Sequence, residues 1–328
     1  MYEGTVAPGR LRSLLQRRPV DGAIVFGVAL FIVLLLLNIA SNPQTFGLEQ
    51  LPVTIGFAAP IVLVAFATTP SLLMGSGGID LSVGPVMGLV NVVIIYQLVE
   101  RFDVKSPFIL IPAALGIGVA AGLINGIIVA FIRIQPIVAT LGTYLVYVGL
   151  TVLIAPTPGG QAPEWLATLA GTFSFVPIVV ALLIWWGFRH LPFYEHLMAY
   201  GGDERAVYTS GINVKSIRIG AFAFGGLFAG LGGLSLSAVL GSADPTVGAN
   251  YTLLGIAAAA LGGISLAGGR GGMLRALLGA LAIFLLQNLL TFWNVSSFVL
   301  QVAYGTILVV AVTANGQFSE LVKRVSSR

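Results

Sequence analysis

Long apolar segments alternate with short polar connections along almost the whole chain. The apolar segments are continuous and lack the period-two alternation that the strands of a membrane β-barrel need. Most of them approach the length at which a helix crosses a hydrocarbon layer of about 30 Å. The pattern therefore predicts an all-α polytopic membrane protein with about ten transmembrane helices. The expected spans are residues 24–40, 51–69 (interrupted by Pro60), 85–99, 108–132, 137–155, 176–188, 217–240, 252–261, 273–290 and 298–313.

Composition supports a membrane protein and argues against several kinds of chemistry. Of the 328 residues, 57% are hydrophobic and 9% are charged, whereas soluble domains carry about 25% charged residues. The chain has no cysteine, so disulfides, thiolate metal sites and cysteine nucleophiles are excluded. No phosphate-binding P-loop pattern occurs, and His190 and His196 do not have the spacing of a zinc-protease motif. We expect no enzyme activity, cofactor, metal site or nucleic-acid partner.

The basic residues indicate how the chain is oriented. With ten spans and a cytoplasmic N-terminus, Arg101 and Lys105 fall outside, and the other fourteen of the sixteen Lys and Arg residues fall inside. Such an excess of inside positive charge is the usual bias of membrane proteins. It predicts a cytoplasmic N-terminal segment (residues 1–22), a cytoplasmic tail (315–328) and a cytoplasmic polar loop (188–218).

The loop over residues 188–218 is the only long, strongly polar segment in the interior of the chain, and it separates two hydrophobic halves. Within it, Asp203 and Glu204 suit a helix N-terminus, and Gly211 suits the position just after a helix C-terminus. The pattern predicts a short helix from about Asp203 to Ser210, with Ala206, Val207 and Ile212 available to pack against a partner. The alternative is a solvated loop that merely joins the halves.

A second group of polar residues interrupts the apolar segments. Asp80 and Ser82 lie in the run Gly-Gly-Ile-Asp-Leu-Ser-Val-Gly, between Pro70 and Pro85, where the glycines and prolines favour a broken helix. The two residues either cap the start of the next helix, or Asp80 lies beside a translocation path as an ionisable group. Asn125, Gln287 and Asn288 either form interhelical hydrogen bonds or contact a substrate.

Two further patterns concern how the helices pair. The segments around Asn125 and Asn288 share an Asn near a helix end, a turn and an aromatic–Gly pair, which favours an inverted five-plus-five repeat. Gly226 and Gly230 form a GxxxG pair that lets helix backbones approach closely. We expect this pair to pack within the chain rather than at a dimer seam.

Three segments together resemble a known family. They are GSGGIDLSVG (residues 75–84), AYGGDERAVYTSGINV (199–214) and LGGISLAGGRGGMLRALLGA (261–280). In this order they resemble the ribose-type permease subunits of bacterial ABC importers, within the branched-chain/ribose permease family, and the likeness extends from about Val53 to Val312. The resemblance implies one permease domain over residues 1–328 in the bacterial inner membrane, moving a ribose-type sugar. Asp203 departs from the family, which usually has asparagine there.

The resemblance also implies partners and site residues. The partners would be ABC ATPase subunits in the cytoplasm, a periplasmic or lipid-anchored sugar-binding protein, and a second permease subunit, identical or a close paralogue. The alternative function is a stand-alone secondary transporter or channel for a small polar solute. Translocation-path candidates are Asp80, Ser82, Asn125 and Asn288. Contacts with the ATPase are expected at Gly201, Gly202, Asp203, Glu204, Arg205, Ala206, Ser210, Gly211 and Ile212.

Overall fold

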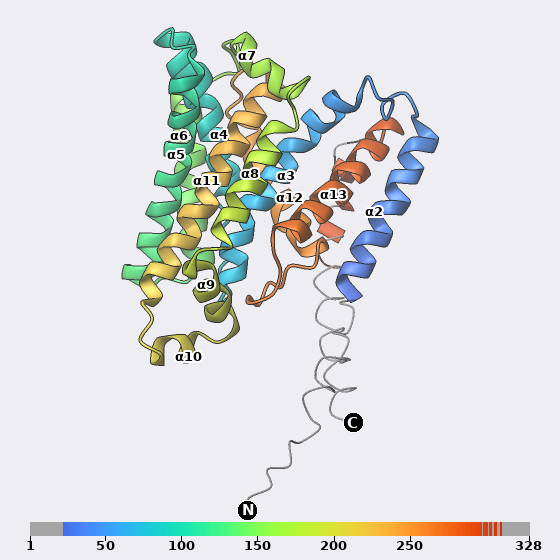
Figure 1. The fold of residues 1–328 in the computed structure, drawn as a ribbon. Coiled ribbons are helices and arrows are strands. Elements are labelled where there is room, and N and C mark those ends of the chain that lie inside the picture. Colours follow the sequence, from blue (N-terminus) through green and yellow to red (C-terminus); the bar gives the residue numbers. More distant parts are fainter. Residues whose placement is uncertain (1–21, 297, 301, 304, 307–308, 310–328) are drawn as a thin grey trace, which may run out of the picture.

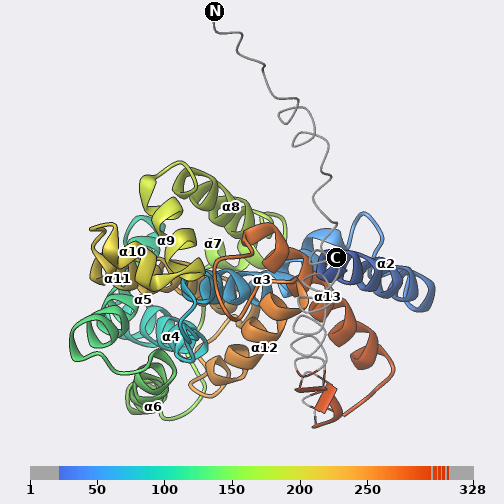
Figure 2. The same ribbon diagram turned by 90° about the horizontal axis from the view of Figure 1, so that it is seen from below.

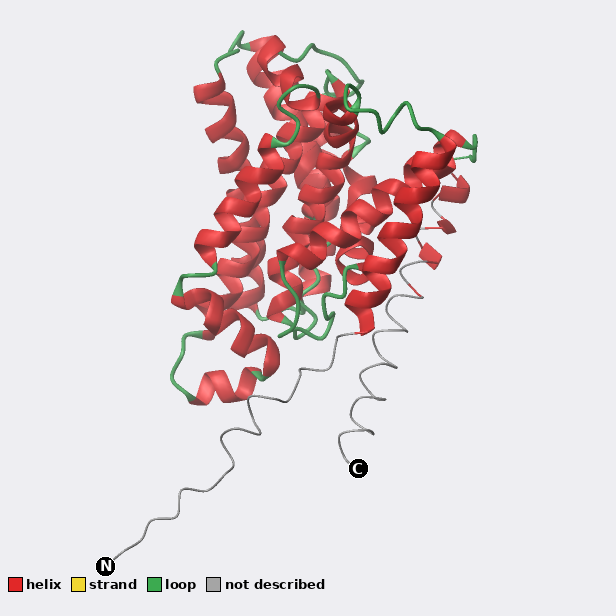
Figure 3. Cartoon of the chain, turned by 45° about the vertical axis from the view of Figure 1, so that its right-hand side comes forward, coloured by secondary structure: helices red, strands yellow, loops and turns green. Residues whose placement is uncertain are grey.

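A computed structural model describes residues 22–296, 298–300, 302–303, 305–306 and 309. In this part, helices are joined by loops (Figure 3), and the β-structure is one isolated bridge between Gly159 and Ala243. The α-helices are α2 (Gly22–Ser41), α3 (Leu51–Met74), α4 (Val83–Val92), α5 (Pro107–Ile127), α6 (Pro136–Ile154), α7 (Glu164–Ala167), α8 (Val176–Phe188), α9 (Pro192–Gly202), α10 (Glu204–Thr209), α11 (Val214–Leu240), α12 (Gly248–Leu261) and α13 (Met273–Phe292). Two π-helices, η1 (Val93–Arg101) and η2 (Ile128–Ile132), continue α4 and α5, and a 3₁₀ turn, η3 (Thr168–Ala170), follows α7.

The prediction of a helical polytopic protein is confirmed, but the number of spans is lower in the described residues. Seven helices are long and apolar enough to cross a membrane, or eight if α8 and α9, bent by 84° at their junction, form one span. The expected spans at 176–188 and 252–261 correspond to helices of only 13 and 14 residues. Half of the residues of the expected tenth span, 298–313, lie outside the described residues.

Helix α11 lies at the centre of one half of the bundle, against α3, α4 and α5 (Figures 1 and 2). The contact with α5 is close because glycines face one another. A Cβ on Gly226 would collide with the carbonyl oxygen of Gly118, and one on Gly230 would lie 2.6 Å from the carbonyl oxygen of Ala114. The GxxxG pair therefore packs within the chain, as predicted. On the other side of α3, helices α12, α13 and α2 follow one another.

The helix break before α4 lies further along the chain than Pro60 and Pro70 suggested. Helix α3 contains both Pro60 and Pro70 and ends at Met74; its C-cap is Gly75, whose φ is +68°. Proline in a membrane helix is tolerated where the surrounding helices pack closely around it, and the helix is buried on both sides of Pro70, from Ala58 to Met74. The expected end of this span near residue 69 was therefore wrong by about one turn.

The polar segment 188–218 is mostly helical. It contains all of α9 and α10 and the first residues of α11. Both short helices lie at one end of the bundle, as Figure 1 shows at the bottom and Figure 2 shows from below. The short helix that the sequence predicted after residue 203 is α10. Helix α7 and the turn η3 lie at the opposite end of the bundle.

Candidate functional site

Three glycine-rich segments from distant parts of the sequence meet at the α10 end of the bundle. They are the loop after α3, the end of α9 and the loop between α12 and α13. A Cβ on Gly201 would collide with the carbonyl oxygen of Leu73 and the nitrogen of Gly269. A Cβ on Gly75 would lie 2.6 Å from the carbonyl oxygen of Ala267, and the amide of Gly269 donates to the carbonyl oxygen of Leu73 at 3.0 Å. We call this contact the glycine junction; only residues without a side chain permit it.

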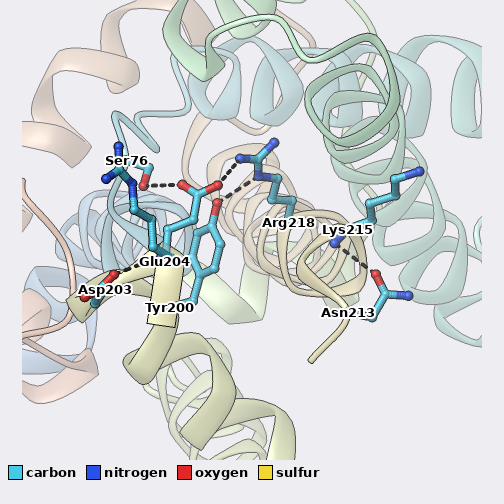
Figure 4. Close-up of polar contacts among 8 residues, drawn as sticks. Ser76, Tyr200, Asp203, Glu204, Asn213, Lys215 and Arg218 are labelled. Carbon is cyan, nitrogen blue, oxygen red and sulfur yellow. Dashed lines mark hydrogen bonds and ion pairs between the residues drawn. The ribbon is translucent and has the colours of Figure 1, made fainter. Parts of the chain in front are cut away.

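A chain of polar contacts lies beside the glycine junction (Figure 4). The hydroxyl of Ser76 donates to Glu204 Oε2 at 2.9 Å, and Arg218 Nη2 donates to Glu204 Oε1 at 2.7 Å. Arg218 Nε also donates to the hydroxyl oxygen of Tyr200 at 2.8 Å. Burial raises the pKa of the Tyr200 phenol, so this group stays protonated. We call these four residues the Glu204 clamp; they connect α9, α10, α11 and the loop after α3.

The start and end of α10 follow the rules of helix capping. Asp203 Oδ1 accepts hydrogen bonds from the amides of Arg205 and Ala206 at 2.9 and 3.1 Å, which satisfies two amides of the first turn. At the other end, the hydroxyl of Ser210 donates to the carbonyl oxygen of Ala206, and Gly211 has a φ of +80°. The predicted roles of Asp203 and Gly211 are thus confirmed.

Helix α10 buries one side and exposes the other. Val207 is buried against the rest of the chain, and Ile212 is half-buried there, so the expectation that Val207 is free for a partner was wrong. Arg205, Ala206 and Tyr208 are exposed, and Tyr208 has 72% of its surface accessible. The candidate residues from Gly201 to Ile212 therefore divide into those that hold α10 in place and those that face outward.

The loop after α3 continues into a buried polar cluster. Asp80 Oδ1 accepts from both the amide and the hydroxyl of Ser82, at 2.8 and 2.7 Å. Asn125 Nδ2 donates to the Ser82 hydroxyl oxygen at 2.7 Å, and Thr143 donates to Asn125 Oδ1 at 2.7 Å. Thr140 holds the loop by donating to the carbonyl oxygen of Ile79 and accepting from the amide of Leu81. All five side chains are buried.

The cluster corrects one of the two interpretations of Asp80 and Ser82. Ser82 is the N-cap residue of α4, but its side chain makes no capping hydrogen bond. Its hydroxyl donates to Asp80 instead, and the carboxylate of Asp80 bonds within the loop rather than to α4. The carboxylate is almost wholly buried, with 3% of the residue exposed. A buried acidic side chain held by hydroxyl and amide groups is expensive in a membrane protein and is characteristic of functional sites.

The structure brings together three of the four predicted path residues. Asn288 is half-buried on α13, which packs against α2, α3 and α12, away from Asn125 on α5. Thr140 and Thr143 were missed. A signal was present, because Thr140, Thr143, Tyr147 and Thr151 recur at the spacing of one helix face, and all four are buried.

The described Lys and Arg residues are divided unequally between the two ends of the bundle. Arg101 and Lys105 lie at the α7 end, where Trp165 donates to the carbonyl oxygen of Lys105. The other seven described Lys and Arg residues lie at the α10 end: Arg133, Arg189, Arg205, Lys215, Arg218, Arg270 and Arg275. In the described part of the chain, no group of three or more His, Cys, Asp or Glu residues could hold a metal ion.

Comparison with known proteins identifies the family. The sequence profile of the family described as "Branched-chain amino acid transport system / permease component" matches residues 51–313. The chain belongs to this permease family. The ribose import permease protein RbsC of Haemophilus influenzae is 32% identical over 303 residues, covering 88% of this permease and 91% of the relative. RbsC of Bacillus subtilis is 35% identical over 260 residues (76% and 79%).

A relative named for another sugar matches almost as much of the permease. The galactose/methyl galactoside import permease protein MglC of Haemophilus influenzae is 28% identical over 308 residues, covering 86% of this permease and 91% of the relative. No solved structure matches the chain. The matched range includes the glycine junction, the Glu204 clamp and the buried polar cluster, and the apolar helices agree with a multi-pass membrane permease.

Proposed function

We propose that this permease is the transmembrane subunit of an ATP-driven ABC importer and carries a monosaccharide delivered by an extracytoplasmic binding protein. The relatives named for ribose and galactose, which match most of the chain, support a sugar over a branched-chain amino acid. One observation carries the mechanical part of the proposal. Helix α10 directly follows the end of α9, which Gly201 holds in backbone contact, and Glu204 of α10 accepts a hydrogen bond from the loop that bears Asp80.

The proposed topology has ten spans, with α8 and α12 as short spans and residues 298–313 as the tenth, arranged as an inverted five-plus-five repeat. Both termini and the α10 end face the cytoplasm. Seven of the nine described basic residues at that end support this orientation, because positive charge is retained on the cytoplasmic side. The whole chain then forms one permease domain in the inner membrane.

Helix α10 is the proposed contact with an ATPase subunit, with Arg205, Ala206 and Tyr208 facing the partner. Asp203, Ser210 and Gly211 define the ends of the helix, and Gly201 and Glu204 hold it against the permease; Gly202 and Ile212 complete the segment. A push on α10 would reach Ser76 through Glu204 and then Asp80, four residues further along the same loop. Movement of packed elements between discrete arrangements is how such coupling is transmitted.

The buried cluster of Asp80, Ser82 and Asn125, completed by Thr140 and Thr143, is the proposed polar lining of the translocation path in another conformational state. Hydroxyl, amide and carboxylate groups are suited to sugar hydroxyls, since they both donate and accept hydrogen bonds. A second permease subunit and two ATPase subunits would complete the importer. The chain itself would hydrolyse no ATP.

Uptake into proteoliposomes tests the proposal. The permease would be reconstituted alone, and together with the ATPase subunit and binding protein of its own transport system, and uptake of radiolabelled ribose and galactose measured with and without ATP. We expect uptake only in the complete system with ATP. Uptake by the permease alone, driven by an imposed ion gradient, would instead establish a stand-alone secondary transporter.

The contact itself can be tested separately because the chain has no cysteine. Ala206→Cys should form a cross-link with a cysteine placed on the ATPase surface. The control is Phe102→Cys, which is also exposed but lies at the opposite end of the bundle. Cross-linking at residue 102 and not at 206 would refute the orientation.

A further inference from the structure

A groove with apolar walls opens between α8 and the start of α13, at the α10 end of the bundle. Its volume is about 510 Å³. The walls are formed mainly by Val179, Leu182, Leu183 and Trp186 of α8 and by Leu274 of α13. Leu183, Trp186 and Leu274 each have 60% or more of their surface exposed. The groove therefore opens outward, on the surface that a membrane protein presents to lipid.

Positive charge is concentrated at one end of this groove. Arg189 follows the last residue of α8, and Arg275 lies in the first turn of α13. The guanidinium of Arg189 stacks near the ring of Tyr194, 5.8 Å from its centroid, and Arg275 Nη1 donates to the carbonyl oxygen of Gly263 at 2.8 Å. None of the described residues that line the groove is acidic. The two arginines are thus fixed where the apolar walls end.

The N-terminus of α13 adds to the positive potential. Its N-cap is Gly272, which offers no side-chain hydrogen bond, and its first turn has no acidic residue. The first amides of an uncapped helix carry a partial positive charge that favours an anion. Trp185 and Trp186 lie in the last turn of α8, just before Arg189, and tryptophan is enriched where a membrane meets water.

We propose that this groove binds one anionic phospholipid, with an acyl chain against the apolar walls and the phosphate between Arg189, Arg275 and the start of α13. Arginine suits phosphate because its guanidinium can donate two parallel hydrogen bonds, and basic pockets between membrane helices bind anionic head groups. A free phosphate ion would make no use of the five apolar side chains. The site does not depend on which solute the permease carries.

Quenching of tryptophan fluorescence by brominated lipids measures this binding directly. Replacing Trp165 and Trp293 with Phe leaves only the two tryptophans of the groove. The full chain would be reconstituted in phosphatidylcholine with increasing fractions of phosphatidylglycerol or phosphatidylcholine brominated in the acyl chains. We expect phosphatidylglycerol to quench at a mole fraction about fivefold lower, because one basic residue near a membrane surface contributes that order of preference.

Two variants separate head group from acyl chain. Arg189→Gln should remove most of the preference for phosphatidylglycerol. Its matched control is Arg101→Gln, because Arg101 is also exposed and also stacks 5.8 Å from a ring centroid, that of Phe102, but at the opposite end. Val179→Phe should narrow the groove and weaken quenching by both lipids. Unfolding by detergent would verify that each variant is folded.

Several results would overturn the proposal. Equal quenching by the two lipids, or a preference that survives Arg189→Gln, would show that the arginines bind no head group. Loss of the preference on adding millimolar inorganic phosphate would indicate a soluble anion. Efficient disulfide formation between two copies carrying Leu274→Cys would show that a second permease covers the groove.

Discussion

The glycine junction provides the sharpest test. Gly201 and Gly202 form one glycine pair in the sequence, but in the structure only a Cβ on Gly201 would meet other backbone segments. A Cβ on Gly201 would collide with the carbonyl oxygen of Leu73 and the nitrogen of Gly269, and would lie 3.0 Å from the Cα of Gly269. These atoms belong to the backbone, so no side-chain rotation relieves the contact. A Cβ on Gly202 meets nothing within 4 Å.

The magnitudes follow from these contacts. Overpacking a rigid site costs about 1–3 kcal/mol, and separating the amide of Gly269 from the carbonyl oxygen of Leu73 costs about another 1 kcal/mol. We therefore expect Gly201→Ala to lower the free energy of unfolding by about 2–4 kcal/mol. Gly202→Ala ends the same helix without a collision, so it should leave stability unchanged or raise it by up to about 1 kcal/mol.

Reversible unfolding in mixed micelles, followed by tryptophan fluorescence, measures the difference between the two variants. ATP-driven uptake by the complete importer would fall with Gly201→Ala, since α10 would no longer be seated. Equal unfolding midpoints for the two variants would refute the reasoning, because the three glycine segments would then have room to spare.

Three further predictions concern neighbouring parts of the site. Glu204→Gln keeps an acceptor for Ser76 but removes the charge that pairs with Arg218. Because this pair is partly exposed, we expect a stability loss below about 1 kcal/mol together with a clear loss of uptake per ATP hydrolysed. Unchanged uptake per ATP would contradict the proposed role. Asn125→Leu removes the buried hydrogen bonds that Asn125 makes with the hydroxyls of Ser82 and Thr143, and should cost about 1–3 kcal/mol in the same unfolding assay. The exposed Leu123→Ala should change stability by less than about 1 kcal/mol. Asp203→Ala removes the N-cap of α10 and should cost about 1 kcal/mol, measured as faster hydrogen exchange in that helix. Asp203→Asn keeps a capping side chain and should be nearly neutral. Equally fast exchange in both variants would contradict this capping role.

The coarse features of the molecule could be predicted from sequence, because in a membrane each apolar segment must form its own backbone hydrogen bonds. Each apolar run had to be a helix, since backbone groups in lipid must be bonded within the segment. The short helix α10 was equally accessible, because its capping residues Asp203 and Gly211 act on their own neighbours. The length of α3 was not accessible, because Pro70 suggests a helix break unless the packing that buries the helix around it is known.

The sites were predictable as residues but not as a structure. Glycine-rich motifs at residues 75–84, 199–214 and 261–280 were evident as marked segments, and nothing in their spacing indicates that they touch. Likewise, Asp80 and Asn125 were separate candidates, and Thr143 was unnoticed until α6 placed it against Asn125.

By itself, the sequence determined the helical class, most of the membrane helices and the family, because these depend on composition and on short-range pattern. Only the tertiary structure decided that Gly201 is indispensable where Gly202 is not, that Val207 faces inward, and that Glu204 reaches the loop of Asp80. These facts depend on which backbone segments approach within van der Waals distance, and such approaches are made by elements that lie far apart in the chain.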